Sequence, residues 1–257
     1  MRLISWNVNG IRAVQKKGFL DWFKKENPDI LCLQETKAAP EQLDAALLQV
    51  PGYSACWCAA EKKGYSGVAV YTRQEPLSVA QGLGDAVFDS EGRTLILDMG
   101  DFVLFNIYYP NGGAGNKRVP FKLAFYELFL KKAEAFRRQG RHVVIVGDVN
   151  TAHQPVDLAR PKENVKNTGF LPEERAWVTR FLDAGYVDTF RHFTPDGGHY
   201  SWWDFKTGAR ARNVGWRIDY CFIDQALLPA LSHAFILGDV LGSDHCPVGI
   251  TLKLDAV

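Results

Sequence analysis

Short apolar runs recur along the whole chain, and they are rich in β-branched and aromatic residues. Several alternate between apolar and polar side chains, which is the period of a half-buried β-strand. The runs cover residues 3–8, 30–34, 67–72, 93–99, 102–109, 142–149, 199–203, 218–223, 234–239 and 247–254. The pattern therefore predicts about ten strands.

Four stretches between these runs have the apolar spacing of amphipathic helices. They cover residues 18–26, 41–47, 121–138 and 173–184. The third is the clearest, because Phe125, Phe129 and Phe136 lie broadly on one face. The fourth has Pro172 at its start and Gly185 after its end, the expected placement of both residue types.

The connections between predicted strands are of two kinds. Some strands follow one another through a tight turn, such as residues 99–102, whereas helices separate others. This mixture disfavours a strictly alternating parallel sheet. We predict an α/β fold, a four-layer sandwich in which two mixed β-sheets pack face to face with helices on the outside. The chain has no Gly/Ser/Pro-rich linker and no repeat, so residues 1–257 are predicted to form a single domain.

The composition is that of an ordinary globular protein. Of 257 residues, 47% are hydrophobic and 23% are charged, which argues against a disordered, collagen-like or disulfide-stapled chain. The formal net charge is only +1, which disfavours a polycation that coats nucleic acid by charge alone. Any polyanion must be met by a local basic patch.

The cysteines and the start of the chain bear on the compartment. The five cysteines are scattered, and Cys56 and Cys58 are separated by one residue, which is not the spacing of a zinc knuckle or a redox pair. We expect reduced thiols, with Cys32 in the core. No secretory signal is apparent, and no stretch approaches the roughly 20 apolar residues of a membrane span. A soluble, cytoplasmic protein without membrane association is expected.

Polar side chains follow or flank six of the apolar runs. They are Asn7 and Asn9, Gln34 and Glu35, Tyr108 and Asn111, Asp148 and Asn150, Asp219, and Asp244 with His245. Residues two apart in an extended strand point the same way, so these groups can converge on one rim of the sheets. Such a cluster is rich in oxygen ligands and has one histidine but no cysteine. This chemistry favours Mg²⁺ or Mn²⁺ over zinc.

Each of these fragments has a structural explanation by itself. A glutamate after a strand is commonly a solvated strand end, and Gly-Asp-x-Asn is commonly a turn. Ser-Asp-His can be a cap. Only the combination of all six, in this order, indicates a functional site.

Nine motifs cover much of the chain. They are residues 5–12, 33–37, 63–69, 108–112, 147–153, 157–164, 169–175, 213–220 and 242–247. With these motifs the chain resembles the exonuclease III type of apurinic/apyrimidinic (AP) endonuclease, within the endonuclease/exonuclease/phosphatase superfamily. Gln-Glu, Gly-Asp-x-Asn and Ser-Asp-His occur across that superfamily, whereas the segments 157–175 and 213–219 are more specific to its DNA-repair branch.

The resemblance implies a deoxyribonuclease-I-like fold and a reaction. Water would attack the phosphodiester on the 5′ side of an abasic site and leave a 3′-hydroxyl and a 5′-deoxyribose phosphate. An additional 3′→5′ exonuclease or 3′-end-cleaning activity is expected. The implied partner is double-stranded DNA with abasic sites or 3′ ends, the implied cofactor is Mg²⁺ or Mn²⁺, and the chain would act as a monomer.

The resemblance also implies roles for single residues. Glu35 would be the main metal ligand, with Asn7, Asn9 and Asp244 as further ligands or supports. Some relatives carry an acid at the position of Asn9, so the metal site here is expected to be less anionic. Asp148 would position or deprotonate the attacking water. The remaining catalytic residues would orient that water, bind the phosphate or hold the histidine: Asn150, Tyr108, Asn111, His245 and Asp219.

Substrate recognition is expected from a pocket and from local cations. Trp202, Trp216 and Ile218 would wall an apolar pocket for the extruded sugar, too small for a normal nucleotide. Trp203 is predicted to lie in the core. The implied DNA contacts are Arg12, Lys37, Arg210 and Arg212.

Two alternative functions stay open at the level of sequence. Another superfamily phosphoesterase, acting on RNA, phosphoinositide or sphingomyelin, would keep Glu35, Asp148 and His245 but not the 157–175 segment or the Trp pocket. A catalytically inactive DNA-binding module would be expected to have lost one of those three residues, and none is lost.

Overall fold

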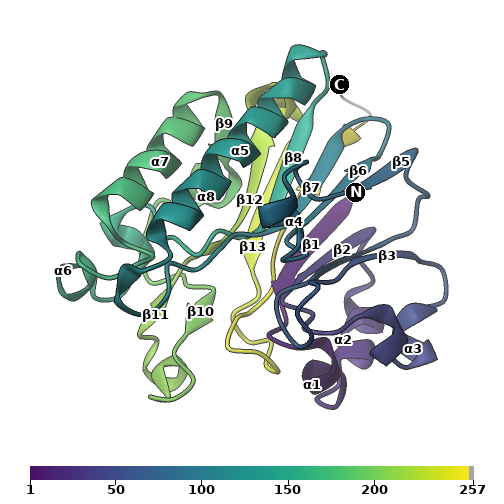
Figure 1. Cartoon of the computed structure of the whole chain (residues 1–257), viewed down its shortest axis with the longest axis horizontal. Helices are drawn as coiled ribbons and strands as arrows, with labels where there is room; N and C mark the ends of the chain where they lie inside the picture. Colours follow the sequence, from purple (N-terminus) through teal and green to yellow (C-terminus); the bar gives the residue numbers. More distant parts are fainter. Residues whose placement is uncertain (255–257) are drawn as a thin grey trace.

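Two six-stranded sheets form the centre of the protein in this computed structural model (Figure 1), which describes residues 1–254. The first sheet has the strand order β13-β14-β1-β2-β4-β3. Its strands are β1 (Arg2–Asn7), β2 (Ile30–Gln34), β3 (Ser54–Cys58), β4 (Val68–Thr72), β13 (Leu231–Ile236) and β14 (Val248–Leu252).

The second sheet has the order β5-β6-β7-β8-β12-β9. Its strands are β5 (Ser78–Gln81), β6 (Thr94–Asp98), β7 (Val103–Tyr108), β8 (Val143–Asp148), β9 (Tyr186–Asp188) and β12 (Asp219–Asp224). A separate two-stranded sheet joins β10 (Trp202–Trp203) to β11 (Gly215–Trp216).

Helices connect and cover these strands. The α-helices are α1 (Ile11–Gln15), α2 (Phe19–Glu26), α3 (Ala45–Leu48), α4 (Ala86–Asp89), α5 (Val119–Arg138), α6 (Pro161–Asn164), α7 (Pro172–Asp183) and α8 (Thr189–Phe193). Short 3₁₀ helices are η1 (Pro40–Gln42), η2 (Ala114–Asn116), η3 (Pro155–Asp157), η4 (Ala209–Arg212) and η5 (Gln225–Ala230).

Both sheets are mixed, as predicted. Strands β1 and β2 pair in parallel, and so do β7 and β8, while their other neighbours are antiparallel. A parallel pair needs a crossover connection. The helices α1 and α2 supply it for the first pair, and α5 supplies it for the second. The strands of each pair end at the same edge of their sheet. A hydrogen bond between Asn7 at the end of β1 and Asp148 at the end of β8 brings the two edges together.

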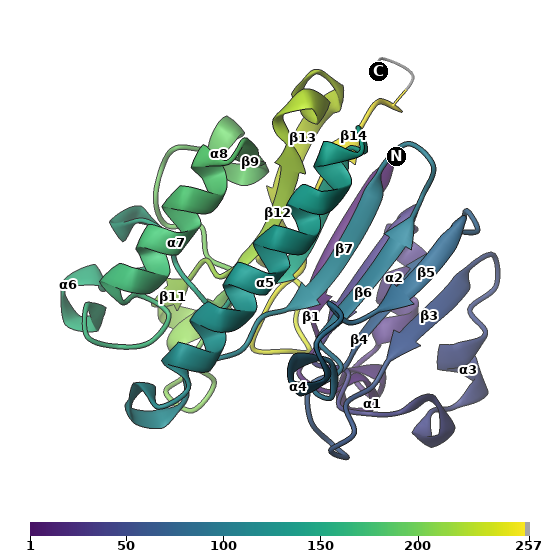
Figure 2. The ribbon, with the colours of Figure 1, turned by 45° about the horizontal axis from the view of Figure 1, so that its top comes forward.

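Three of the buried clusters of apolar side chains pack the two sheets and their helices together. The central one lies between the sheets and includes Leu3 and Val70 from the first sheet and Leu104 and Val146 from the second. A second core packs the other sheet's outer face against α5 and α7, which lie side by side in Figure 2. A third packs the first sheet against α1 and α2. The predicted four-layer sandwich is confirmed, whereas the single domain stays a prediction.

Several element boundaries differ from the predictions. The helix predicted at 41–47 is instead η1 followed by the one-turn α3, because Leu43 between them is extended (φ −109°, ψ 149°). The strand predicted at 199–203 shrinks to β10, and the one at 234–239 begins earlier as β13. Four strands were not predicted: β3, β5, β9 and β11. Strand β5 is exposed along its whole length and β9 has three residues, so neither carries a hydrophobic signal.

Two predictions about the core and the surface can be checked directly. The five cysteines are free thiols, and Cys32 is buried as predicted. Trp203 is also buried, with 5% of its surface exposed. Within residues 1–254, no helix has both the length and the apolar character that crossing a membrane requires.

Candidate active site

The site lies where the strands of both sheets end. Asn7 closes β1 and pairs in register with Gln34, which closes β2 and precedes Glu35. In the other sheet Tyr108 closes β7 opposite Asp148, the last residue of β8. Parallel strands thus bring the carboxyl ends of four strands together.

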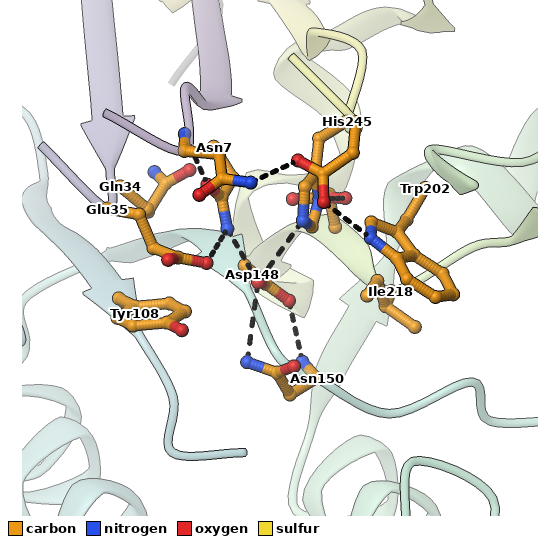
Figure 3. A network of polar contacts seen from close by, with 12 residues as sticks. Asn7, Gln34, Glu35, Tyr108, Asp148, Asn150, Trp202, Ile218 and His245 are labelled. Atoms are coloured by element: carbon orange, nitrogen blue, oxygen red, sulfur yellow. Dashed lines mark hydrogen bonds and ion pairs between the residues drawn. The ribbon is translucent and has the colours of Figure 1, made fainter. Parts of the chain in front are cut away.

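The antiparallel strand β12 completes this rim. Its first residue, Asp219, pairs with Asp148. The loop before β14 carries His245 to the same place (Figure 3). The convergence expected from the sequence is therefore produced by the strand register.

Asn7 links the two carboxylates at the centre. Its amide nitrogen donates to Glu35 Oε1 at 2.9 Å and to Asp148 Oδ2 at 2.8 Å, as Figure 3 shows. Its amide oxygen accepts the backbone N–H of Asn9 at 3.0 Å. In this arrangement Asn7 acts as a donor that spaces two carboxylates, so its predicted role as a metal ligand stays a prediction.

His245 is held by a buried carboxylate. Its Nδ1 lies 2.8 Å from Asp219 Oδ2, and its Nε2 lies 3.9 Å from Asp148 Oδ2. Ser201 supports Asp219, because its hydroxyl donates to the same Oδ2 at 2.6 Å. The Asp219 carboxylate thus leaves Nε2 of the imidazole facing Asp148, the arrangement of an oriented acid or base.

Asn150 and Asn111 extend the network beyond Asp148. The backbone N–H of Asn150 donates to Asp148 Oδ1 at 2.8 Å, and its amide nitrogen donates to the Tyr109 carbonyl at 2.9 Å. Asn111 donates to the Asn150 side-chain oxygen at 3.2 Å. Tyr108 lies beside Glu35 (Figure 3). The structure therefore brings all six predicted catalytic residues into one neighbourhood.

The backbone is unusual at several of these positions. Asn9, Glu35, Lys37 and Asn150 all adopt positive φ, between 45° and 55°. Such conformations are costly for residues other than glycine and tend to occur at functional sites. Gly147, just before Asp148, is required for a different reason: a Cβ there would lie 1.8 Å from the Ile107 carbonyl oxygen.

Burial and charge shift the proton affinities of the central groups in different directions. Burial, reinforced by the Asp219 carboxylate, raises the pKa of Asp148. Burial alone would lower the pKa of His245, but the Asp219 carboxylate outweighs it and raises that pKa. Burial would raise the pKa of Glu35, yet the Lys37 ammonium and the Asn7 amide outweigh it and lower that pKa. At neutral pH these directions favour a charged Glu35 and a protonated His245.

The donor set fits a hard divalent cation. One ligand atom each from Glu35, Asp148 and His245 lies within 4.8 Å of the others. The two carboxylate oxygens are the ligands that Mg²⁺ and Mn²⁺ prefer, whereas a protonated His245 offers a cation no free lone pair. A cation would also relieve the repulsion between the buried carboxylates. Of the predicted metal ligands, only Glu35 belongs to this group.

The other predicted ligands lie at the rim. Asp244 is bonded to the Asn9 amide at 2.9 Å and to the Trp202 indole at 3.1 Å. The Lys37 ammonium contacts Glu35 Oε2 at 2.7 Å and also bonds Asn9. Lys37 therefore neutralises Glu35, in addition to any contact with DNA. The predicted ligand roles of Asn9 and Asp244 stay predictions.

An apolar cluster, the predicted pocket wall, adjoins the polar cluster. Trp202 and Trp216 face each other across β10 and β11, with ring centroids 6.3 Å apart. Both pack on a buried cluster that includes Ile218 and Phe170. Because Trp202 also bonds Asp244, the wall and the polar cluster are physically connected. Phe170 was not predicted here, although it stands in the 169–175 motif.

The predicted DNA-binding cations differ in their surroundings. Arg12 is exposed on α1, and Arg212 is exposed in η4. Arg210 instead donates to the backbone carbonyls of Gly238 and Val240 and lies over the Trp203 ring at 4.6 Å. Its guanidinium therefore stabilises the 238–243 loop, a geometry that does not favour the predicted phosphate contact.

Two residues that hold the site were not identified from the sequence. Ser201 holds Asp219, and Lys122 donates to the backbone carbonyl of Asn150 at 2.6 Å. Ser201 carries no signal in a single sequence. Lys122 carries a weak one, since it interrupts the apolar side of the 121–138 helix.

Known proteins share this fold and sequence. The chain is 46% identical over 256 residues to an exodeoxyribonuclease of Bacillus subtilis (strain 168), covering 99% of this chain and 100% of that protein. It is 43% identical over 260 residues to the DNA repair nuclease APEX1 of Danio rerio, covering 99% and 83%. The crystal structure of an AP endonuclease from Leishmania major is similar with a TM-score of 0.88 and 30% identity, covering 98% of this chain and 87% of that one.

The family model agrees with these relatives. The model of the endonuclease/exonuclease/phosphatase family matches residues 4–245, a range that begins in β1 and ends at His245. This range and the relatives together show that the chain belongs to the endonuclease/exonuclease/phosphatase family.

Proposed function

We propose that this protein is a metal-dependent AP endonuclease of DNA base-excision repair. It hydrolyses the phosphodiester 5′ to an abasic site and leaves a 3′-hydroxyl and a 5′-deoxyribose phosphate. An accompanying 3′→5′ exonuclease or 3′-end-cleaning activity is supported by the similarity to an exodeoxyribonuclease along the full chain.

One observation carries this proposal. A cluster of Glu35, Asp148 and His245, with ligand atoms within 4.8 Å of one another, adjoins an apolar wall of Trp202, Trp216 and Ile218. The polar cluster suits hydrolysis of a phosphodiester, and the apolar wall suits a sugar that carries no base. The alternative phosphoesterases of the superfamily, acting on RNA, phosphoinositide or sphingomyelin, would not be expected to have this Trp wall.

The roles of the polar residues follow from their contacts. Asp148 accepts hydrogen bonds from Asn7 and Asn150, so its oxygens are directed to take a proton from an attacking water. The oxygen of that water bonds to phosphorus while the bond from phosphorus to the 3′ oxygen breaks, and the departing 3′ oxygen takes a proton from solvent water to become the 3′-hydroxyl. His245 donates from Nε2 to a non-bridging phosphate oxygen, because Asp219 occupies Nδ1. Tyr108 and Asn111 contribute further hydrogen bonds to the phosphate.

A divalent cation belongs to this proposal. When Mg²⁺ or Mn²⁺ is bound, it stabilises the negative charge that develops on the phosphate and the leaving oxygen. Glu35 is the residue we expect to hold it, with Asn7, Asn9 and Asp244 as additional or supporting ligands.

Partners and location are part of the same proposal. The substrate is double-stranded DNA, held by Arg12, Lys37 and Arg212 along the backbone and by the Trp pocket at the abasic sugar. We expect the protein to act as a monomeric single domain in the cytoplasm, where its buried thiols stay reduced.

The test is cleavage of an end-labelled duplex that contains one abasic analogue. With Mg²⁺ or Mn²⁺ we expect a single cut on the 5′ side of the analogue with a 3′-hydroxyl end. EDTA or Ca²⁺ alone should abolish it. An intact duplex and a single-stranded RNA serve as controls. Cleavage of the RNA instead of the abasic duplex, or cleavage in EDTA, would contradict the proposal.

A further inference from the structure

A fully buried ion pair contacts residues 150 and 151, which follow Asp148 in the chain. Lys122 on α5 and Glu174 on α7 are 2.6 Å apart, and both side chains are 0% exposed. Burying two charges costs free energy that a single ion pair does not generally recover. If the pair served stability alone, apolar residues of similar volume would serve as well. The other contacts of the two side chains therefore indicate what the pair does.

The lysine side of the pair is hydrogen-bonded to the backbone segment that follows Asp148. Lys122 Nζ donates to the backbone carbonyl of Asn150 at 2.6 Å and to the Thr151 hydroxyl at 2.8 Å. With Glu174, these partners use all three ammonium protons. Asn150 has a positive φ of 55° and donates its N–H to Asp148. Lys122 thus bonds the carbonyl of a residue whose other backbone group fixes the proposed base.

The glutamate side is attached to the pocket. Glu174 accepts the backbone N–H of Gly169 at 2.6 Å, the N–H of Leu171 at 3.0 Å and the Thr168 hydroxyl at 2.7 Å. Gly169 is packed tightly between the two parts of the site. A Cβ on it would lie 3.2 Å from both the Asn150 carbonyl oxygen and the Trp216 ring.

We propose that Lys122 and Glu174 are positioning residues that set the distance between the proposed base Asp148 and the pocket wall at Trp216. The inference rests on the proposed function. The pair joins residues 148–151 to residues 168–171 through charge-assisted hydrogen bonds, which are short and strongly directional. Small displacements between reacting groups reduce rates strongly, so loss of the pair acts on the chemical step.

Four variants separate positioning from stability. Lys122→Met and Glu174→Gln each remove one charge and leave the other buried. The double variant Lys122→Met with Glu174→Leu removes both charges and keeps the volume nearly constant, so neither charge is left buried without its partner. Arg180→Gln is the matched control, because Arg180 pairs with Glu127 across the same two helices at the surface.

The measurements are the Tm, the single-turnover cleavage rate on abasic duplex, and amide hydrogen exchange of residues 148–152 without DNA. We expect the double variant to regain part of the Tm lost in the single variants, because no unpaired charge is buried, while its rate stays about 10-fold or more below wild type. Its 148–152 amides should exchange faster than in wild type. Arg180→Gln should keep the wild-type rate and exchange.

The outcomes are decisive in both directions. Recovery of the cleavage rate together with the Tm in the double variant would show a purely structural pair and overturn the inference. If wild type leaves the abasic duplex intact, the proposed function fails. Amide hydrogen exchange of residues 148–152 still tests the positioning role in that case. If these amides exchange as slowly in Lys122→Met and in the double variant as in wild type, the positioning role is refuted.

Discussion

Asp148 lies at the centre of the site. Its carboxylate accepts hydrogen bonds from the Asn7 amide and the backbone N–H of Asn150, and His245 Nε2 lies 3.9 Å away. Asp148→Asn keeps the size and most of these contacts but cannot take a proton. We expect the cleavage rate to fall by about 10²–10⁴-fold, while the Kd for abasic duplex measured in EDTA changes little. A variant that retained substantial cleavage would remove Asp148 from its proposed role.

The proton on His245 depends mainly on Asp219. Burial alone would lower the pKa of His245, but the Asp219 carboxylate, with smaller contributions from Asp148 and Asp244, raises it to about 10. A raised pKa favours the folded state below the ordinary value of about 6.5. That contribution disappears as the pH rises through about 10. In Asp219→Asn the carboxylate charge is lost, and we expect the pKa of His245 to fall by about 1–3.

Nitrogen NMR titration of the imidazole measures this change. Asp224→Asn is the control, because Asp224 closes the same strand at its opposite end. The activity of Asp219→Asn should also be lost at lower pH than in wild type. An unchanged His245 titration in Asp219→Asn would show that other groups hold the proton.

At the scale of elements, the two-stranded β10–β11 sheet holds the Trp202 and Trp216 side chains next to each other. Trp216 on β11 packs against Trp202, Phe170 and the buried Ile218 cluster. Trp216→Ala opens the pocket to normal nucleotides and leaves the backbone contacts to DNA in place. We expect the preference for abasic over intact duplex to fall by about 10-fold or more, because a normal nucleotide would no longer be excluded by size.

The measurement compares the two dissociation constants at one salt concentration, because affinity for DNA changes with salt. Trp57→Ala removes another half-buried indole on β3 at the far edge of the first sheet, and it should leave the preference unchanged. An equal loss of affinity for both duplexes in Trp216→Ala would contradict a pocket role.

At the scale of the whole molecule, the sheets share one core, so we expect the chain to unfold in a single transition. A metal that binds only the folded chain should therefore raise a single Tm. At about 100 times its Kd, Mn²⁺ would add ~2.7 kcal/mol of stability, and a chain of this size gains about 2–4 °C per kcal/mol. We expect Glu35→Gln to reduce that shift strongly.

Differential scanning calorimetry with and without Mn²⁺ tests this prediction. Glu163→Gln, a change at an exposed carboxylate on α6, should preserve the wild-type shift. Two separate transitions would refute the single domain. A full shift in Glu35→Gln would place the metal elsewhere.

The hydrophobic pattern was sufficient to predict the main strands, the helices α5 and α7 and the four-layer class. Burial of a strand's apolar positions is a local property that alternation records. The polar stops at Glu35, Asp148 and His245 were visible for the same reason, because each interrupts or flanks an apolar run. Edge strands such as β5 left no signal, since exposed residues are under no hydrophobic constraint.

Contacts between distant segments were decided by the tertiary structure alone. The direction of the Asn7 amide depends on how the β1–β2 and β7–β8 pairs face each other. The burial of Lys122 depends on where α5 and α7 cross the second sheet, and the engagement of Arg210 depends on the 238–243 loop. A single sequence specifies which groups are present, whereas sheet register and layer packing determine which groups meet.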